Sequence, residues 1–253
     1  MPISRIFQAT FLALHEQIHL DEKASHHVAR VLRAKIGDQL ILFNGQGGEY
    51  LSVIEHINKK GVDLAIIEFI SREAESPVDL CFAQGIARGN KMDFIVQKSV
   101  ELGVNKIVPL MTERCHIKRN TLQEKKRLIH WQSVAISACE QCGRNRLPMI
   151  TLPMMLEEWV PQAKANYRFV LSPHHSNSTN SKNVNARQRS IILLIGAEGG
   201  LTDNEVKLAI RYQFSPLHLG PRILRTETAG LAAISIIQAC WGDMKTFSTI
   251  NKV

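Results

Sequence analysis

The sequence contains no apolar segment long enough to span a bilayer, although 45% of its 253 residues are apolar. A membrane-spanning helix needs about 20 consecutive apolar residues. The opening residues, MPISR, also lack the apolar core of a secretory signal. These absences disfavour a membrane protein or a secreted one, so we expect a cytoplasmic chain without a membrane partner.

Metal and redox motifs are scarce as well. The five cysteines (Cys81, Cys115, Cys139, Cys142 and Cys240) are odd in number and scattered, which is typical of reduced thiols and not of a disulfide framework. Only Cys139 and Cys142 are separated by two residues, and no second Cys or His pair follows at the spacing of a zinc site. The sequence therefore predicts no metal site.

The common nucleotide-binding and nucleophile motifs are missing too. The sequence has no Walker loop and no Ser-His-Asp motif. Gly196, Gly199 and Gly200 lack the G-x-G-x-x-G spacing of a dinucleotide site, and no acid follows at the expected distance of about 20 residues. Such glycines either let a ligand approach the backbone or form a tight turn. Glu198 between them needs a partner if it is buried.

Positive charge is present in excess, and the excess is local. The formal net charge is +8. Residues 1–72 hold eight Lys or Arg and eight Asp or Glu, whereas residues 84–146 hold twelve Lys or Arg and five acids. If these basic side chains share a face, they attract a polyanion with strong salt dependence. A solvated helix face explains the same residues without a ligand.

The first part of the chain favours β-structure. Its β-branched runs predict strands over Gln39–Phe43, Glu49–Ile57 and Gly61–Ser71, with one helix before them near Lys23–Arg33. Such short strands close most simply into a small barrel. A polar stretch ending in Pro77 follows, so we expect one domain over residues 1–72 and a second over residues 73–253.

The second part alternates strands with longer helices. Strands are expected over Val78–Ala83, Val104–Leu110, Arg168–Leu171 and Ser190–Ile195, and helices over Lys91–Leu102, Leu122–Gln141 and Thr226–Trp241. This alternation predicts an α/β domain with a mostly parallel sheet and helices on both faces. The polar stretch from Ser172 to Ser190 is expected to be an exposed, mobile loop.

Two loops of this second part carry the densest chemistry. The strand ending at Ile195 runs into the glycine loop, residues 196–200, and then into a helix that Thr202 and Glu205 would open with a capping box. Further on, the motif LGPRILRTETA (residues 219–229) lies between a short apolar strand and the last helix. Ligands of α/β sheets bind at the carboxyl ends of strands, so the two loops are expected to share one pocket.

Arg222 and Arg225 within that motif have two interpretations. They could pair with Glu227, whose charge also suits a helix N-terminus. However, arginine at a helix start has the unfavourable sign unless an anion lies nearby, which favours a phosphate or an ionised base as the target.

Motifs spread over the whole chain resemble one family. They are Arg5-x-Phe7, HHVARVLR (26–33), GQGGEY (45–50), KMDFIVQK (91–98), ELGV (101–104), TERC (112–115), EQCGRN (140–145), EGG (198–200) and LGPRILRTETA (219–229). Together they resemble the ribosomal RNA small subunit methyltransferase E family, in the SPOUT class of S-adenosylmethionine-dependent enzymes. The chain departs from the family at Ala197, where proline is usual, at Asn90, where an acid is common, and at Gly230, where alanine is usual.

The resemblance implies a fold and a reaction. The fold would be a small PUA-like, RNA-binding β-barrel followed by a SPOUT-type α/β domain with a trefoil knot and a mostly parallel sheet. The reaction would be methylation of N3 of uridine 1498 in 16S rRNA of the small ribosomal subunit. The protein would be a homodimer, with the face of the last helix that carries Leu231, Ile234, Ile237 and Trp241 against the partner.

The resemblance and the two loops together give candidate site residues. We expect Arg225 and Glu227 to be catalytic, with Arg225 stabilising charge on the uracil ring and Glu227 orienting it or handling the proton. The expected S-adenosylmethionine-binding residues are Leu171, Leu194, Ile195, Gly196, Glu198, Gly199, Gly200, Leu219, Gly220, Ile223, Leu224 and Thr226. The expected RNA-binding residues are Arg5, Arg30, Arg33, Lys91, Arg114, Arg144 and Arg222. A SPOUT enzyme acting on another RNA and a non-catalytic RNA-binding assembly factor remain as alternatives.

Overall fold

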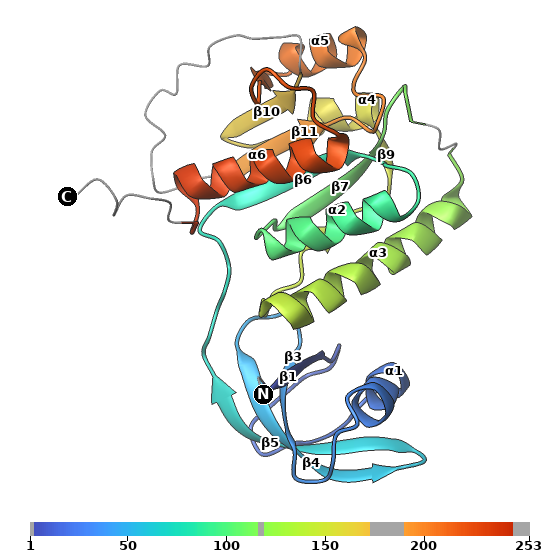
Figure 1. Ribbon diagram of the computed structural model, residues 1–253, viewed down its shortest axis with the longest axis vertical. Helices are drawn as coiled ribbons and strands as arrows, with labels where there is room; N and C mark the ends of the chain where they lie inside the picture. Colours follow the sequence, from blue (N-terminus) through green and yellow to red (C-terminus); the bar gives the residue numbers. More distant parts are fainter. Residues whose placement is uncertain (1–2, 116–118, 173–189, 245–253) are drawn as a thin grey trace, which may run out of the picture. The chain divides into compact units, whose positions relative to one another are not determined.

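The computed structural model describes residues 3–115, 119–172 and 190–244 and divides the chain into two compact units (Figure 1). Unit 1 is Met1–Glu75 with Ile136–Leu147, and unit 2 is Ser76–Ala135 with Pro148–Val253. The segment Ile136–Leu147 was expected in the second domain, but the structure packs it with the first. The loop expected between Ser172 and Ser190 lies outside the described residues.

Unit 1 contains a five-stranded sheet in the order β1-β3-β4-β5-β2. Its strands are β1 (Ser4–Phe7), β2 (Gln17–His19), β3 (Gln39–Phe43), β4 (Glu49–Asn58) and β5 (Gly61–Ile70). Strands β1 and β3 are parallel, and the other neighbours are antiparallel. The sequence pattern predicted β3, β4 and β5, whereas it missed β1 and β2, which are too short to show a period.

A short helix covers the core of unit 1. Helix α1 (Glu22–His26) is capped by Asp21, whose side chain accepts from the Ala24 N–H at 2.8 Å, and it continues into the π-helix η1 (His27–Val31). Alternate side chains of the strands, such as Leu40, Leu42, Ile54, Leu64 and Ile66, form the hydrophobic core with Val28 of η1. This period of two is what a half-buried sheet requires.

A polar network joins Ile136–Leu147 to the strands of unit 1. Arg5 Nη1 donates to Glu49 Oε2 at 2.5 Å, and Arg5 Nη2 donates to the side chain of Asn145. Arg72 Nη1 donates to the same Glu49 oxygen at 3.1 Å and to the Gly143 carbonyl at 2.9 Å. Burial opposes ionisation of Glu49, but the hydrogen bond and charge of Arg5, with the charge of Arg72, outweigh it and lower the pKa of this carboxyl.

Unit 2 is built on a seven-stranded sheet. Its main path runs β12-β10-β11-β6-β7-β8, and β9 pairs with β7. The strands are β6 (Asp79–Gly85), β7 (Lys106–Met111), β8 (Met149–Ile150), β9 (Met154–Met155), β10 (Tyr167–Leu171), β11 (Ser190–Ile195) and β12 (Ser215–Leu217). All the pairings are parallel. The carboxyl ends of the strands therefore meet along one edge.

Helices cover both faces of this sheet (Figure 1). Helices α2 (Asn90–Glu101) and α6 (Thr226–Trp241) contact each other on one face. On the other face, α4 (Leu156–Trp159), η2 (Val160–Gln162) and α5 (Asp203–Arg211) pack against a core that includes Ile192 and Leu194 of β11. Burial on both faces explains why β11 is a continuous apolar run and not an alternating one.

The long helix α3 (Thr121–Cys142) begins in unit 2, and its last residues belong to unit 1. Within the described ranges, no helix combines the length and the apolarity that crossing a membrane requires.

Candidate active site in unit 2

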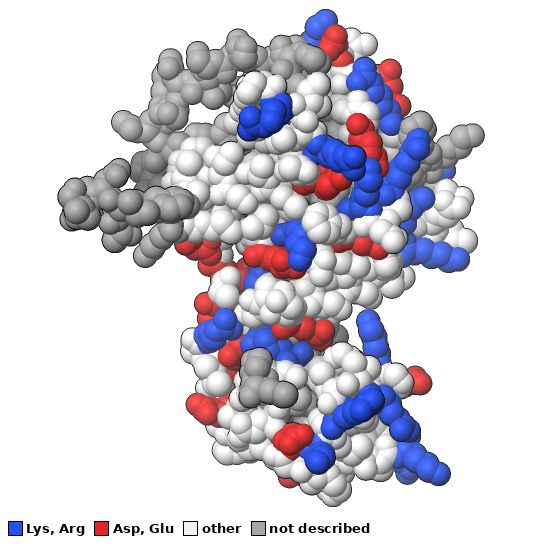
Figure 2. All heavy atoms as spheres, in the orientation of Figure 1, with Lys and Arg blue, Asp and Glu red and all other residues white. Residues whose placement is uncertain are grey.

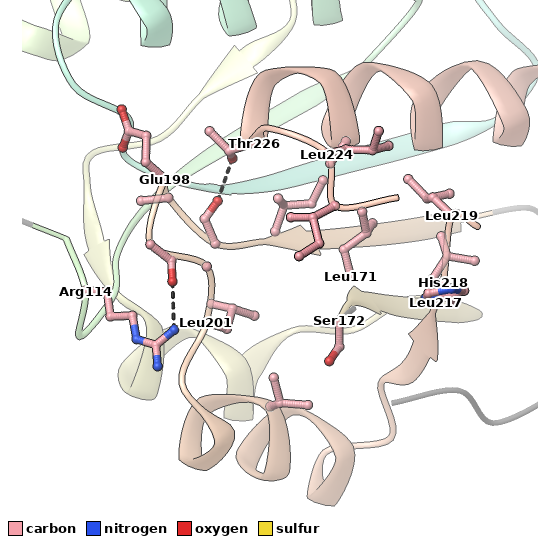
Figure 3. Close-up of a pocket in the computed structure, with 18 of the residues that line it drawn as sticks. Arg114, Leu171, Ser172, Glu198, Leu201, Leu217, His218, Leu219, Leu224 and Thr226 are labelled. Atoms are coloured by element: carbon pink, nitrogen blue, oxygen red, sulfur yellow. Dashed lines mark hydrogen bonds between the residues drawn. The ribbon is translucent and has the colours of Figure 1, made fainter. Parts of the chain in front are cut away.

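A cavity of about 280 Å³ lies at the carboxyl ends of β10, β11 and β12 (Figure 3). Three stretches of chain supply most of the wall. They are Leu171 at the end of β10, the glycine loop directly after β11, and residues 217–224, which begin at the last residue of β12. The first turns of α5 and α6 complete the wall with Asp203, Val206, Thr226 and Ala229. Because these strands are neighbours in a parallel sheet, the two loops singled out in the sequence meet here.

Every residue expected to bind the cofactor lines this cavity except Leu194. Leu194 is fully buried in the core on the α4 and α5 side of the sheet. The sequence missed other lining residues, notably Leu217 and His218 at the end of β12. A three-residue strand is too short to show an alternating apolar pattern, so the sequence did not predict β12. The position of these two residues directly before the LGPR motif was the sequence feature that could have identified them.

The glycine loop is folded tightly on itself. Gly200 N–H donates to the Ala197 carbonyl at 2.9 Å, and Gly200 has a positive φ of 69°. A Cβ on Gly196 would lie 2.6 Å from the Leu201 nitrogen, so only glycine fits without moving the backbone. The tight turn proposed for these glycines is therefore present, and it places the loop backbone along the cavity wall.

Glu198 directs its carboxylate away from the cavity (Figure 3). Its Oε1 accepts from the backbone N–H of Arg88 at 2.9 Å and lies 3.6 Å from Lys91 Nζ. Burial opposes ionisation, but these contacts and the N–H of Glu198 itself lower the pKa of the carboxyl. Glu198 thus connects the glycine loop to the segment that follows β6. It borders the cavity with atoms other than its carboxylate.

The start of α6 is anchored to the same loop. Thr226 Oγ1 donates to the Gly196 carbonyl at 2.7 Å, as drawn in Figure 3. Gln84, fully buried at the end of β6, donates from Nε2 to Thr226 Oγ1 at 2.9 Å and to the Gly196 carbonyl at 3.0 Å. These hydrogen bonds therefore connect the first turn of α6 to the ends of β6 and β11.

Arg225 and Glu227 lie on either side of the anchored Thr226. Arg225 is exposed, and neither it nor Arg222 pairs with Glu227 among the described residues. One carboxylate oxygen of Glu227 is buried without a hydrogen-bond partner in the part of the chain that the structure describes. The structural ion pair considered from the sequence is thus not formed, and both groups remain available to a ligand.

The expected RNA-binding residues are distributed over both units. Arg30 and Arg33 are exposed on unit 1, in and after η1, where basic side chains gather over α1 (Figure 2). In unit 2, Arg222 and Arg114 line the cavity, and Lys91 faces Glu198. Arg114 Nη1 donates to the Gly199 carbonyl at 2.8 Å.

Arg5 and Arg144 were expected to contact RNA, and the structure corrects both. Arg144 is 3% exposed and donates from Nε and Nη2 to the two carboxylate oxygens of Glu75, at 3.0 and 2.6 Å. Arg5 is engaged with Glu49 and Asn145 inside unit 1. A buried guanidinium needs such partners, so these arginines hold unit 1 together and do not present a charge to a ligand.

Two segments of the chain match two family models. Residues 20–67 match an RNA methyltransferase PUA domain, and residues 74–238 match an RNA methyltransferase domain. These matches define an RNA methyltransferase with a PUA-like domain, and they agree with a pocket at the carboxyl ends of a parallel sheet.

Relatives and solved structures narrow the class. Ribosomal RNA small subunit methyltransferase E of Buchnera aphidicola is 38% identical over 96% of this chain and 98% of its own, and that of Bacillus subtilis is 31% identical over 84% and 86%. A methyltransferase structure from Legionella pneumophila with bound SAM superposes with a TM-score of 0.91, at 39% identity over 96% of this chain and 100% of that one.

A small subunit methyltransferase E from Neisseria gonorrhoeae bound to S-adenosyl methionine gives a TM-score of 0.87, at 32% identity over 96% and 99% of the two chains. The chain therefore belongs to the ribosomal RNA small subunit methyltransferase E family. The expected fold class, a PUA-like domain with a SPOUT-type, mostly parallel α/β domain, is confirmed. The knot stays a prediction.

Proposed function

We propose that this chain transfers a methyl group from S-adenosylmethionine to N3 of one uridine, uridine 1498, in 16S rRNA of the small ribosomal subunit. The observation that carries the proposal is the cavity at the carboxyl ends of β10, β11 and β12, bordered by the start of α6. The names of the relatives and the cofactor bound in the solved neighbours support the substrate and the methyl donor.

The cavity fits this cofactor. Leu171, Leu217 and Val206 give it apolar walls, and the glycine loop and residues 219–224 bring backbone groups to its edge. An adenine ring packs against apolar walls, while its ring nitrogens and amino group need hydrogen-bond partners that backbone groups supply. When bound, S-adenosylmethionine supplies an electrophilic methyl group on a sulfonium.

Arg225 and Glu227 perform the chemistry at the uracil ring. N3 of uridine is a weakly acidic imide, so its proton must leave before or during attack on the methyl group. The resulting negative charge spreads over O2 and O4, where a cation stabilises it. Arg225 is that cation, because it is exposed, its chain neighbours Leu224 and Thr226 line the cavity, and it forms no ion pair with Glu227 among the described residues. Glu227, which has one carboxylate oxygen without a hydrogen-bond partner in the described part of the chain, takes the N3 proton.

RNA is held by basic residues of both units in this proposal. Arg30 and Arg33 bind the phosphate backbone from the PUA-like domain, and Lys91, Arg114 and Arg222 bind RNA from the methyltransferase domain. Residues 1–72 form the PUA-like RNA-binding domain of this proposal, and residues 73–253 carry out methyl transfer and add the RNA contacts of Lys91, Arg114 and Arg222. The same proposal includes a cytoplasmic location, where ribosomal subunits are found, and a homodimer.

The direct test uses small ribosomal subunits from a strain that lacks the modification. Purified protein and labelled cofactor are incubated with these subunits, and the product is mapped by mass spectrometry. A single methyl group on N3 of uridine 1498 is the expected result. Label on another RNA or nucleotide would establish a different substrate, and cofactor-independent RNA binding without label would establish an assembly factor.

Arg225→Ala should impair turnover far more than cofactor binding. Removing one donor that acts on developing charge lowers the rate by about 100-fold or more. Raising the pH should partly restore the variant, because prior ionisation of N3 replaces part of what the cation does. Single-turnover methylation across pH at saturating cofactor measures this. Normal turnover, or a defect only in cofactor affinity, would assign Arg225 to structure or to cofactor binding.

A further inference from the structure

Glu205 has more partners than a helix cap requires. In the first turn of α5 it forms a capping box with Thr202, because Glu205 Oε2 accepts from the Thr202 N–H at 2.8 Å and Thr202 Oγ1 accepts from the Glu205 N–H at 3.3 Å. Its other oxygen, Oε1, accepts from the backbone N–H of Glu113 at 2.8 Å. Glu113 lies in the loop after β7, far away in the sequence.

Two more hydrogen bonds join the same segments. Thr202 Oγ1 donates to the Glu113 carboxylate at 2.9 Å, and Arg114 Nη1 donates to the Gly199 carbonyl at 2.8 Å. The loop after β7 therefore holds both ends of the segment from Gly199 to Thr202. Glu205, at the centre of these bonds, is 4% exposed.

The capping box alone does not explain a glutamate at this position. Glutamine also completes a capping box, because a single acceptor oxygen reaches the N-cap N–H. Here the backbone N–H groups of Thr202 and Glu113 are accepted by different oxygens of one side-chain end, and a carboxylate has two such oxygens whereas an amide has one. The second oxygen is therefore used to position another loop.

We propose that Glu205 is a positioning residue that fixes the glycine loop of the cofactor pocket by clamping its far end to the loop after β7. Glu198 already fixes the middle of the glycine loop to Arg88, after β6. The clamp adds a second attachment, to the loop after β7, so the glycine loop is held at two places before any ligand binds. A loop that is already ordered loses less conformational freedom on binding, which raises affinity. This inference rests on the proposed function, because cofactor affinity is one of its two measurements.

The test is Glu205→Gln, which keeps the size of the side chain and the capping box but leaves one backbone N–H facing an amide nitrogen. Cofactor affinity measured by calorimetry should fall about ten-fold, the scale of one hydrogen bond to a charged group. At saturating cofactor, kcat should be unchanged, because the variant alters the loop before binding and not the reacting groups. The melting temperature should fall by only a few degrees, because one buried hydrogen bond is lost in a chain of this size.

Hydrogen exchange of the cofactor-free protein gives an independent measurement. Exchange should become faster in Glu205→Gln at residues 112–115 and 196–202 and nowhere else. The matched control is Glu124→Gln, since Glu124 is also a buried glutamate at the start of a helix and accepts one described backbone N–H, that of Asn120 at 3.0 Å. Its capping bond survives the substitution, so affinity and loop exchange should equal those of wild type.

Unchanged exchange at residues 112–115 and 196–202, or unchanged affinity beside faster exchange, would overturn the clamp. A general fall in protection, or a fall in melting temperature well beyond a few degrees, would show a structural role alone and would overturn it as well. If wild type itself does not bind S-adenosylmethionine, the proposed function fails, while the exchange measurement still decides whether Glu205 fixes the loop.

Discussion

Gly196 is the residue of the glycine loop with the least room. A Cβ there would lie 2.6 Å from the Leu201 nitrogen and would also overlap Gly200, whereas a Cβ on Gly199 would approach no atom closer than the Arg114 Cβ, at 3.0 Å. Gly196→Ala should therefore weaken cofactor binding by about 10-fold or more, since overpacking of a fixed contact costs about 1–3 kcal/mol. Gly199→Ala should be milder. Calorimetry of both variants checks the order, and the reverse order would contradict it.

Glu49 and Glu140 of unit 1 should affect stability with opposite signs. The pKa of Glu49 is lowered, so its ionised form stabilises the fold above the unfolded pKa, and that contribution is lost as the pH falls through the lower folded value. Burial raises the pKa of Glu140 despite its hydrogen bond from the Phe7 N–H and the nearby His27 and Lys23. Ionised Glu140 therefore costs stability at neutral pH.

The matched variants are Glu49→Gln and Glu140→Gln, measured by urea unfolding at pH 8 and at about pH 4. Glu49→Gln should destabilise at pH 8, with a smaller effect at low pH. Glu140→Gln keeps an acceptor for the Phe7 N–H at 3.0 Å and should stabilise at pH 8, with little effect near pH 4. A destabilised Glu140→Gln at pH 8 would show that its charge is compensated.

The positions of residues at the cavity were predicted well where they follow from local sequence, whereas side-chain contacts between distant residues were not. The two loops of the cavity follow directly from strand, glycine and helix signals, and all but Leu194 of the expected lining was found. Arg5 and Arg144 were misjudged because their partners, Glu49 and Glu75, are 44 and 69 residues away in the sequence. Charge and spacing alone do not reveal such pairs.

At the scale of elements, the bounds of β3, β11 and α6 match the sequence pattern, because the two strands are nearly continuous apolar runs and the helix is a longer, mostly apolar stretch between turn residues. The short strands β8, β9 and β12 have two or three residues each and exist because a neighbouring strand pairs with them. Local sequence carries no signal for that kind of strand.

Gly230 in α6 illustrates how two elements constrain each other. Alanine in a helix interior is normally better than glycine by about 1 kcal/mol. Here a Cβ would lie 2.8 Å from Cζ of Phe82, which is fully buried in β6. Gly230→Ala should therefore destabilise by about 1 kcal/mol net, because overpacking costs about 1–3 kcal/mol.

A double variant separates the helix preference for alanine from the steric overlap with Phe82. In a Phe82→Leu background the ring is absent, so adding Gly230→Ala should stabilise the protein relative to Phe82→Leu alone. Denaturant unfolding of the four proteins in this cycle measures the coupling. Equal effects of Gly230→Ala in both backgrounds would show that Phe82 does not limit this position.

For the whole molecule, the face of α6 expected at a dimer interface has to be revised. Ile234 and Ile237 are buried in the core of their own chain, and the Trp241 ring stacks on Tyr167 and Phe169 with centroid distances of 6.3 and 6.1 Å. Ile236, which is 49% exposed, is the large apolar side chain of α6 that faces outward. Over most of its length, the side of α6 that Figure 2 shows is uncharged, and charged side chains appear only near the start of the helix.

We therefore expect a homodimer that Ile236→Glu dissociates, because a carboxylate buried at an apolar interface without a partner is strongly unfavourable. The control is Ile129→Glu on α3, which places the same charge at an isoleucine that is 64% exposed and should leave the dimer intact. Light scattering at micromolar concentration measures both. A monomeric wild type would refute the homodimer. A dimeric Ile236→Glu would show that the subunits meet on a surface other than the exposed side of α6.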